Sequence, residues 1–126
     1  MEKYIIIHKN VTNLWKDGKG FMKEIDIDFS FEGKYINGEK NGKGTEYLLH
    51  YIWFEGEYFD GKKNGKGKEY NFCECIEFDG DYLDDFRRKG KEYYYDEEEE
   101  IVEYEGEYKY GRKWNGKGYD KNGNII

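Results

Sequence analysis

The sequence predicts an all-β protein built from stacked β-hairpins. Three observations support this class: aromatic residues make up 20% of the chain, glycine occurs 17 times, and one short pattern recurs at near-constant spacing. Alanine, glutamine and proline are absent, so strong helix formers are scarce, whereas aromatic residues favour strands. The net charge of −7 and the 39% of charged residues would indicate disorder in a chain with fewer aromatic residues.

The recurring pattern is an aromatic residue, an acid, a glycine, a charged residue and a tyrosine. Its four copies start 23, 24 and 26 residues apart, and self-similarity at such a period is typical of repeat architectures. We expect the 126 residues to form a single domain, with a partial repeat at about 4–24 and full repeats at about 31–53, 54–77, 78–103 and 104–126. The copies are Phe31–Tyr35, Phe54–Tyr58, Phe78–Tyr82 and Tyr104–Tyr108.

Each copy is expected to lie on the first strand of a hairpin. In the segment 25–35, Phe31, Gly33 and Tyr35 alternate with polar residues, which is the period of a strand with one buried face. The equivalent faces in the later copies are Ile52-Phe54-Gly56-Tyr58, Ile76-Phe78-Gly80-Tyr82 and Val102-Tyr104-Gly106-Tyr108.

A turn is expected after each first strand. Asn-Gly pairs stand at 41–42, 64–65 and 115–116, and this dipeptide suits a type I′ turn because both central residues need positive φ. In the third copy Asp85 replaces the turn glycine and the Asn-Gly pair is missing, so its turn is expected to differ. The second strands then repeat Gly-x-Glu-Tyr at 44–47, 67–70 and 90–93.

The hairpins are expected to stack into an elongated molecule. One hairpin of about 23 residues buries too little apolar surface to be stable by itself, so stability must come from contacts between neighbouring units.

This pattern resembles the MORN (membrane occupation and recognition nexus) repeat, whose consensus is approximately Tyr-x-Gly-x-Trp/Tyr followed by Gly-x-x-x-Gly-x-Gly. The four copies carry the resemblance over about 25–119, and the start of the chain is only partly accounted for. The resemblance implies a single-layer, twisted antiparallel sheet of stacked hairpins. It also implies a protein-binding or scaffolding role, and contact with phospholipids.

The aromatic residues beside the repeat glycines are the main candidate site. Glycine inside a strand often marks a bend or a close approach by another group. Either the gap above each glycine is filled by aromatic rings of the protein, or the row of gaps forms a groove for a partner peptide or helix. The partner-binding candidates are Phe31, Tyr35, Phe54, Tyr58, Phe78, Tyr82, Tyr104 and Tyr108.

Basic residues gather in the expected turn segments. The segments 15–20, 37–44, 60–67, 84–90 and 109–118 together carry a formal charge of +9, which leaves −16 for the rest of the chain. A basic edge attracts anionic lipid headgroups, although lysine at turns also serves solubility. The alternative phospholipid-binding residues are Lys62, Lys63, Lys66, Arg87, Arg88, Arg112, Lys113 and Lys117. In a third interpretation, the acids at 97–100 bind a basic partner, as an inhibitor or immunity-type protein would.

No catalytic, cofactor or metal site is predicted. The two histidines, His8 and His50, have no motif spacing to Cys73 and Cys75, and no phosphate-binding loop precedes a helix. Neither nucleic acid nor a small-molecule substrate is expected, given the acidic balance of charge. Without an apolar run of membrane-spanning length or a secretory leader, the chain is interpreted as soluble, intracellular and cytoplasmic.

The chain ends suggest a further expectation. The apolar segment Tyr4–Ile7 and the final Ile125-Ile126 border the repeats. Either a terminal edge strand mediates self-association, or Tyr4–Ile7 folds back as a cap on the aromatic face.

Overall fold

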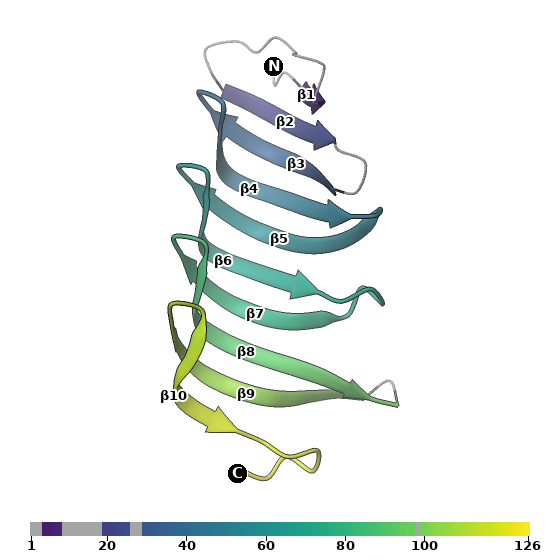
Figure 1. The fold of residues 1–126 in the computed structure, drawn as a ribbon, viewed down its shortest axis with the longest axis vertical. Helices are drawn as coiled ribbons and strands as arrows, with labels where there is room; N and C mark the ends of the chain where they lie inside the picture. Colours follow the sequence, from purple (N-terminus) through teal and green to yellow (C-terminus); the bar gives the residue numbers. More distant parts are fainter. Residues whose placement is uncertain (1–3, 9–18, 26–28, 98) are drawn as a thin grey trace.

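The computed structural model describes residues 4–8, 19–25, 29–97 and 99–126, and it is all-β, as predicted. These residues contain ten strands and no helix. The strands form one sheet in which each strand pairs with its neighbours in sequence (Figure 1). They are β1 (Tyr4–His8), β2 (Lys19–Ile25), β3 (Phe29–Ile36), β4 (Glu39–Leu48), β5 (Tyr51–Phe59), β6 (Lys62–Tyr70), β7 (Ile76–Leu83), β8 (Phe86–Asp96), β9 (Glu99–Lys109) and β10 (Arg112–Gly118).

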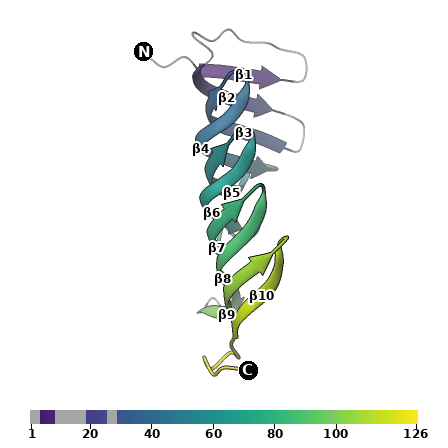
Figure 2. The same ribbon diagram turned by 90° about the vertical axis from the view of Figure 1, so that its left-hand side faces the viewer.

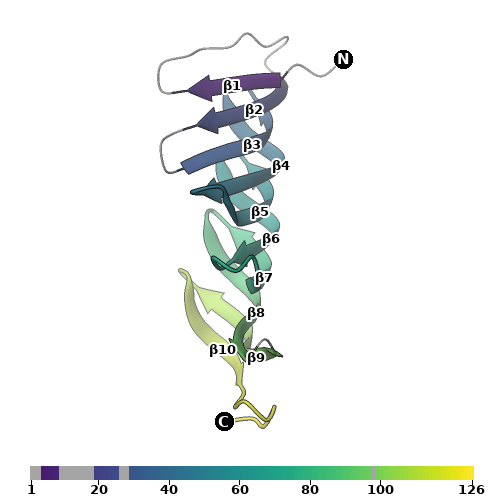
Figure 3. The same cartoon turned by 90° about the vertical axis from the view of Figure 1, so that its right-hand side faces the viewer.

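The sheet is a single twisted layer that extends along the stacking direction. Seen from its two sides, the layer is narrow relative to its length, and the strands curve (Figures 2 and 3). From β2 to β10 every pairing is antiparallel. The turns that close β3–β4, β5–β6, β7–β8 and β9–β10 lie along one edge, which we term the turn edge (Figure 1). The β4–β5 and β6–β7 connections, and the facing ends of β8 and β9, lie along the opposite edge, which we term the loop edge.

The first strand departs from the hairpin pattern. Strand β1 pairs with β2 in parallel, with Tyr4 opposite Phe21, so Tyr4–Ile7 is the terminal strand of the sheet. The expected fold-back of this segment over the aromatic face is therefore wrong. Within the partial repeat, Met22 pairs with Gly33, and residues 9–18 lie outside the described part of the chain.

The turns lie four residues before the predicted positions in the first two hairpins and five residues before in the fourth. Asn37 and Gly38 adopt φ values of 50° and 83°, and the two residues at 60–61 adopt 51° and 83°, as a type I′ turn requires. The third copy was expected to turn differently, but Asp84 and Asp85 adopt the same conformation at 48° and 73°. A two-residue turn can therefore form with or without glycine, at a conformational cost where glycine is absent.

The Asn-Gly pairs lie inside strands, where the pairing register shifts. Opposite Lys34, strand β4 has three residues, 41–43, between its pairings with Tyr35 and Gly33. This β-bulge holds Gly42 at a φ of 94°, and the equivalent Gly65 is at 104°, which is the conformation that glycine adopts without penalty. In the third and fourth hairpins the bulge is one residue shorter.

A continuous row of glycines crosses the sheet. From β3 to β10, each strand contributes one glycine that pairs directly with a glycine of the next strand. A side chain at Gly56 would meet the backbone oxygen of Lys66 at 2.5 Å and the Phe54 ring at 2.8 Å. The row therefore lets the aromatic rings lie directly on the backbone. Its members are Gly33, Gly44, Gly56, Gly67, Gly80, Gly90, Gly106 and Gly116.

The core is a ladder of aromatic rings along the glycine row. We term the face that carries it the inner face and the opposite side the outer face. The Phe54 ring packs edge-on against Tyr58 of its own strand at 5.8 Å between centroids and against Tyr82 of the next hairpin at 5.1 Å. Equivalent contacts continue from Phe31–Tyr58 to Tyr104–Tyr108. Neighbouring hairpins thus complete each other's core, as the repeat predicts.

Candidate functional site

The eight aromatic candidates form this core. Their exposed fractions run from 0% for Phe31 to 7% for Tyr108, so they present no open row to a partner. The expectation of an exposed aromatic contact row is therefore wrong. The rings fill the gaps above the glycines, which is the first of the two alternatives derived from the sequence.

Cationic side chains cover the ladder on its inner side. The Lys63 ammonium lies 4.1 Å from the centroid of the Phe54 ring, and the Arg87 guanidinium lies 4.5 Å from that of Phe78. Lys40 and Lys113 hold the equivalent places over Phe31 and Tyr104, at 4.3 and 5.1 Å. These contacts combine apolar packing of the stems with cation–π attraction.

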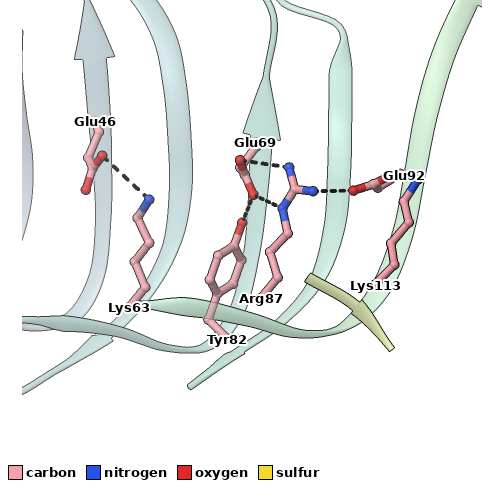
Figure 4. Close-up of polar contacts among 7 residues, drawn as sticks. All are labelled: Glu46, Lys63, Glu69, Tyr82, Arg87, Glu92 and Lys113. Atoms are coloured by element: carbon pink, nitrogen blue, oxygen red, sulfur yellow. Dashed lines mark hydrogen bonds and ion pairs between the residues drawn. The ribbon is translucent and has the colours of Figure 1, made fainter. Parts of the chain in front are cut away.

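Carboxylates from the second strands complete this inner network (Figure 4). Arg87 donates to Glu69 through Nε at 2.7 Å and through Nη2 at 3.0 Å, and it also pairs with Glu92. Tyr82 donates its hydroxyl hydrogen to Glu69, and Tyr58 does the same to Glu46 in the preceding hairpin. Glu46, Glu69 and Glu92 therefore each have a partner, which is the condition for charges to be tolerated in a core.

The network shifts the acidity of its members. Burial raises the pKa of Tyr58 and Tyr82, and the carboxylates of Glu46 and Glu69 raise it further. Burial alone would raise the pKa of Glu69 too, but hydrogen bonds from Arg87 and Tyr82 outweigh this effect and hold it below its usual value. The network is therefore most stable with Glu69 ionised and both tyrosines protonated.

The basic candidates do not gather into one surface. Lys63 and Arg87 lie in the inner network, where their side chains are 21% and 24% exposed, and Lys113 pairs with Glu92 at 3.0 Å. Lys66 forms an ion pair with Asp81 at 2.9 Å. The expectation of a continuous basic edge made of all eight residues is thus wrong. The exposed members outside these ion pairs are Lys62, Arg88, Arg112 and Lys117.

Exposed aromatic side chains lie outside the core at both edges. At the loop edge, the Phe72 ring contacts Tyr51 at 5.9 Å and Trp53 at 5.8 Å; we term these three residues the aromatic patch. At the turn edge, Phe59 and Trp114 are exposed, and Phe86 packs against Tyr110. Sequence reasoning missed both groups, because only positions within the repeat pattern were weighed.

The outer face carries rows of opposite charge. One row runs from Glu32 through Thr45 and Glu55 and continues with alternating bases and acids to Lys117. An open depression of about 600 Å³ lies over its first half, with the glycine row as part of its floor. Tyr47 lines this depression, and Tyr70 donates a hydrogen bond to Glu55.

The remaining candidates lie at the loop edge. His50 is an exposed turn residue with a φ of 74°, and the thiols of Cys73 and Cys75 are free. Glu97, Glu99 and Glu100 are exposed where β8 and β9 connect, while residue 98 lies outside the described part. Within the described ranges, no three histidine, cysteine or acidic side chains gather as they would around a metal ion.

No family model matches the chain, and no curated protein matches it. Where the chain is described, no helix has the length and apolar character needed to cross a bilayer.

Proposed function

We propose that the chain is a non-catalytic protein-interaction or scaffold module. The observation that supports this proposal is the aromatic patch, where Tyr51 and Phe72 are 45% and 55% exposed although the ladder has already supplied a core. Tryptophan and tyrosine are enriched among the residues that dominate binding energy at protein interfaces. The resemblance to MORN repeats implies the same kind of role.

The partner is a protein or a second copy of the chain. The single-layer sheet offers it a rigid support, because every hairpin from β3 to β10 is held by its neighbours over the glycine row. Strand β10 also borders the sheet, and an edge strand with free backbone groups is a common site of pairing.

A recovery experiment with matched variants tests the role of the patch. The full chain, a Trp53→Ser/Phe72→Ser variant and a Phe59→Ser/Leu83→Ser control are immobilised and exposed to a lysate of the source cells. The parent and the control are expected to retain the same protein, and the patch variant to lose it. Equal recovery by both variants would contradict the patch as the binding surface. Light scattering over about a tenfold concentration range tests self-association separately.

Peripheral binding to anionic membranes is a second candidate. Exposed Phe59, Phe86, Tyr110 and Trp114 lie at the turn edge, which also carries Arg88 and Arg112. Basic and aromatic side chains together are typical of membrane-surface contact. Against it, the net charge of −7 repels the same surface.

Vesicle co-sedimentation tests this second candidate. The chain is expected to pellet with vesicles that contain phosphatidylserine and not with neutral phosphatidylcholine vesicles. An Arg88→Glu/Arg112→Glu variant should lose the binding, and added salt should weaken it. Failure to pellet with either vesicle at low salt would exclude membrane binding.

A further inference from the structure

The charge row on the outer face has one interruption, at Thr45. In the later hairpins, Lys68 stands between Glu55 and Asp79, and Lys91 between Asp79 and Glu105. In β4 the same place belongs to Thr45, which pairs with Glu32 on one side and Glu55 on the other. The first hairpin thus has two acids where the others have a base between acids.

On the sides away from Thr45, Glu32 pairs across the strands with Lys23 and Glu55 with Lys68, so only the place over Thr45 lacks a base in this row. The ion pairs in this part of the chain involve Glu46, Glu69, Glu92 and Asp81. Tyr70 donates a hydrogen bond to Glu55, which fixes the position of that carboxylate and leaves its other oxygen able to accept. Adjacent strands lie about 4.8 Å apart, so a cation above Thr45 would lie between Glu32 and Glu55.

The surroundings of Thr45 form a recess suited to a long basic side chain. The residues Glu32, Thr45, Tyr47 and Glu55 all line the depression of about 600 Å³. The Tyr47 ring is close enough to both acids for their charges to raise its pKa, after the larger effect of burial. Tyrosine rings beside carboxylates attract guanidinium and ammonium groups through charge and cation–π contacts.

We propose that the recess over Thr45 binds an arginine or lysine side chain of an extended partner peptide. The partner's cation takes the place that Lys68 and Lys91 hold in the later hairpins. The floor of the depression includes Gly33, Gly44 and Gly56, so the peptide backbone can approach the sheet closely. This inference rests on the proposed interaction function and names the chemistry of its partner.

Peptide titration monitored by nuclear magnetic resonance tests the inference. The probe is an acetylated, amidated peptide of serine and valine with one central arginine, and its control carries citrulline, which keeps the shape and removes the charge. The arginine peptide is expected to shift the amide signals of Thr45, Glu55 and Tyr70 in a saturable manner. Binding of the citrulline peptide with equal affinity would overturn the proposal.

Two variants exchange the residues at equivalent positions. Thr45→Lys places the chain's own ammonium in the recess and should weaken peptide binding at least about tenfold, or about 1.4 kcal/mol. Lys68→Thr opens a second recess between Glu55 and Asp79 and should add a second set of shifted signals around residue 68. Undiminished binding by Thr45→Lys, or no second set in Lys68→Thr, would overturn the proposal.

A third variant and the recovery experiment keep the result interpretable. If Thr45→Lys does not fold, Glu32→Gln replaces it and should weaken binding through loss of one carboxylate. If these variants bind the arginine peptide like the parent while the aromatic patch still recovers a partner from the lysate, the inference fails and the proposed function stands. If no partner is recovered although the peptide binds as expected, the proposed role of the patch fails instead.

Discussion

Arg87 holds the carboxylate of Glu69 through two hydrogen bonds, at 2.7 and 3.0 Å, from the second strand of the neighbouring hairpin. The pair links β6 to β8 across β7 (Figure 4). The Arg87 guanidinium also lies 4.5 Å from the centroid of the Phe78 ring in the aromatic ladder. A fork-shaped donor is needed for both bonds, because the lysine at the equivalent place in the preceding hairpin, Lys63, reaches Glu46 only at 3.9 Å.

Replacing the guanidinium should therefore weaken the fold. Arg87→Met keeps apolar packing over Phe78 but leaves Glu69 half-buried without its cation, and we expect a loss of about 1–3 kcal/mol in the free energy of unfolding. Urea denaturation measures the change. Lys66→Met, which removes an exposed ion pair, is the matched control and should leave the midpoint almost unchanged. Equal losses in the two variants would contradict a special role for the inner network.

The same pair predicts loss of stability in acid. The pKa of Glu69 is lower in the folded chain than its usual value of about 4.3 in an unfolded chain. Its stabilising contribution is therefore complete above that usual value and is lost as the pH falls through the folded pKa. The melting temperature of the parent should fall more steeply below about pH 4 than that of Glu69→Gln. If the melting temperatures of the parent and of Glu69→Gln fell in parallel with pH, the ionisation of Glu69 would not contribute to stability.

Alkaline conditions should destabilise the fold through the buried tyrosines. Burial and the neighbouring carboxylates raise the pKa of Tyr58 and Tyr82 above the usual value of about 10. Their contribution is complete below that value and decreases as the pH rises beyond it. Ultraviolet absorbance should show part of the tyrosine content ionising only together with loss of the β-sheet circular dichroism signal. In the Tyr58→Phe/Tyr82→Phe variant, the fraction of tyrosine that ionises only on unfolding should be smaller.

The glycine row should tolerate no side chain in its centre. In Gly56→Ala the new methyl group would meet backbone atoms at 2.5 and 2.7 Å, so the strands must separate, and we expect a loss of about 3 kcal/mol. Gly118→Ala is the control, because there the nearest atoms, at 3.3 and 3.7 Å, are Cγ1 and Cδ1 of the exposed Ile126 side chain. The midpoints of thermal unfolding of the two variants measure the difference. A Gly56→Ala midpoint equal to that of the control would contradict the packing described.

One loop-edge turn offers a stabilising substitution. His50 adopts a φ of 74°, a conformation that costs a residue other than glycine about 1–2 kcal/mol. We expect His50→Gly to raise the free energy of unfolding by about 1 kcal/mol. Asp85 has nearly the same φ of 73° but accepts a hydrogen bond from the Lys63 amide at 2.8 Å, so Asp85→Gly should gain less. A reversed order of the two variants would show that backbone conformation does not decide the effect.

Much of the fold was predictable because its determinants lie close together in the sequence. Alternation around Phe31, Phe54 and Phe78 identifies the buried face, and the repeat spacing identifies the stacked units. The turns were misplaced because two glycine signals lie four residues apart, as at Gly38 and Gly42, and both need positive φ. Pattern alone does not tell a turn from a β-bulge here; only the pairing of Tyr35 with Lys40 does.

The candidate site was harder to predict, because it depends on contacts between hairpins. Burial of the Phe54 ring follows from Tyr82, 28 residues away, and from the cation of Lys63 above it. Likewise, Thr45 is unremarkable in sequence until strand pairing places Glu32 and Glu55 on either side of it. Phe72 meets Tyr51 and Trp53 only through the pairing of β5 with β6.

The direct pairing of glycine with glycine from β3 to β10 gives every pair of neighbouring units the same close backbone contact along the axis. A duplicated unit, such as residues 54–77, would present a glycine to each of its neighbours in the same way. Each such duplication would lengthen the sheet by two strand spacings, or about 9.6 Å, and would keep the glycine–glycine pairing between neighbouring units. The number of copies thus sets, in fixed steps, the distance between the two ends of the sheet.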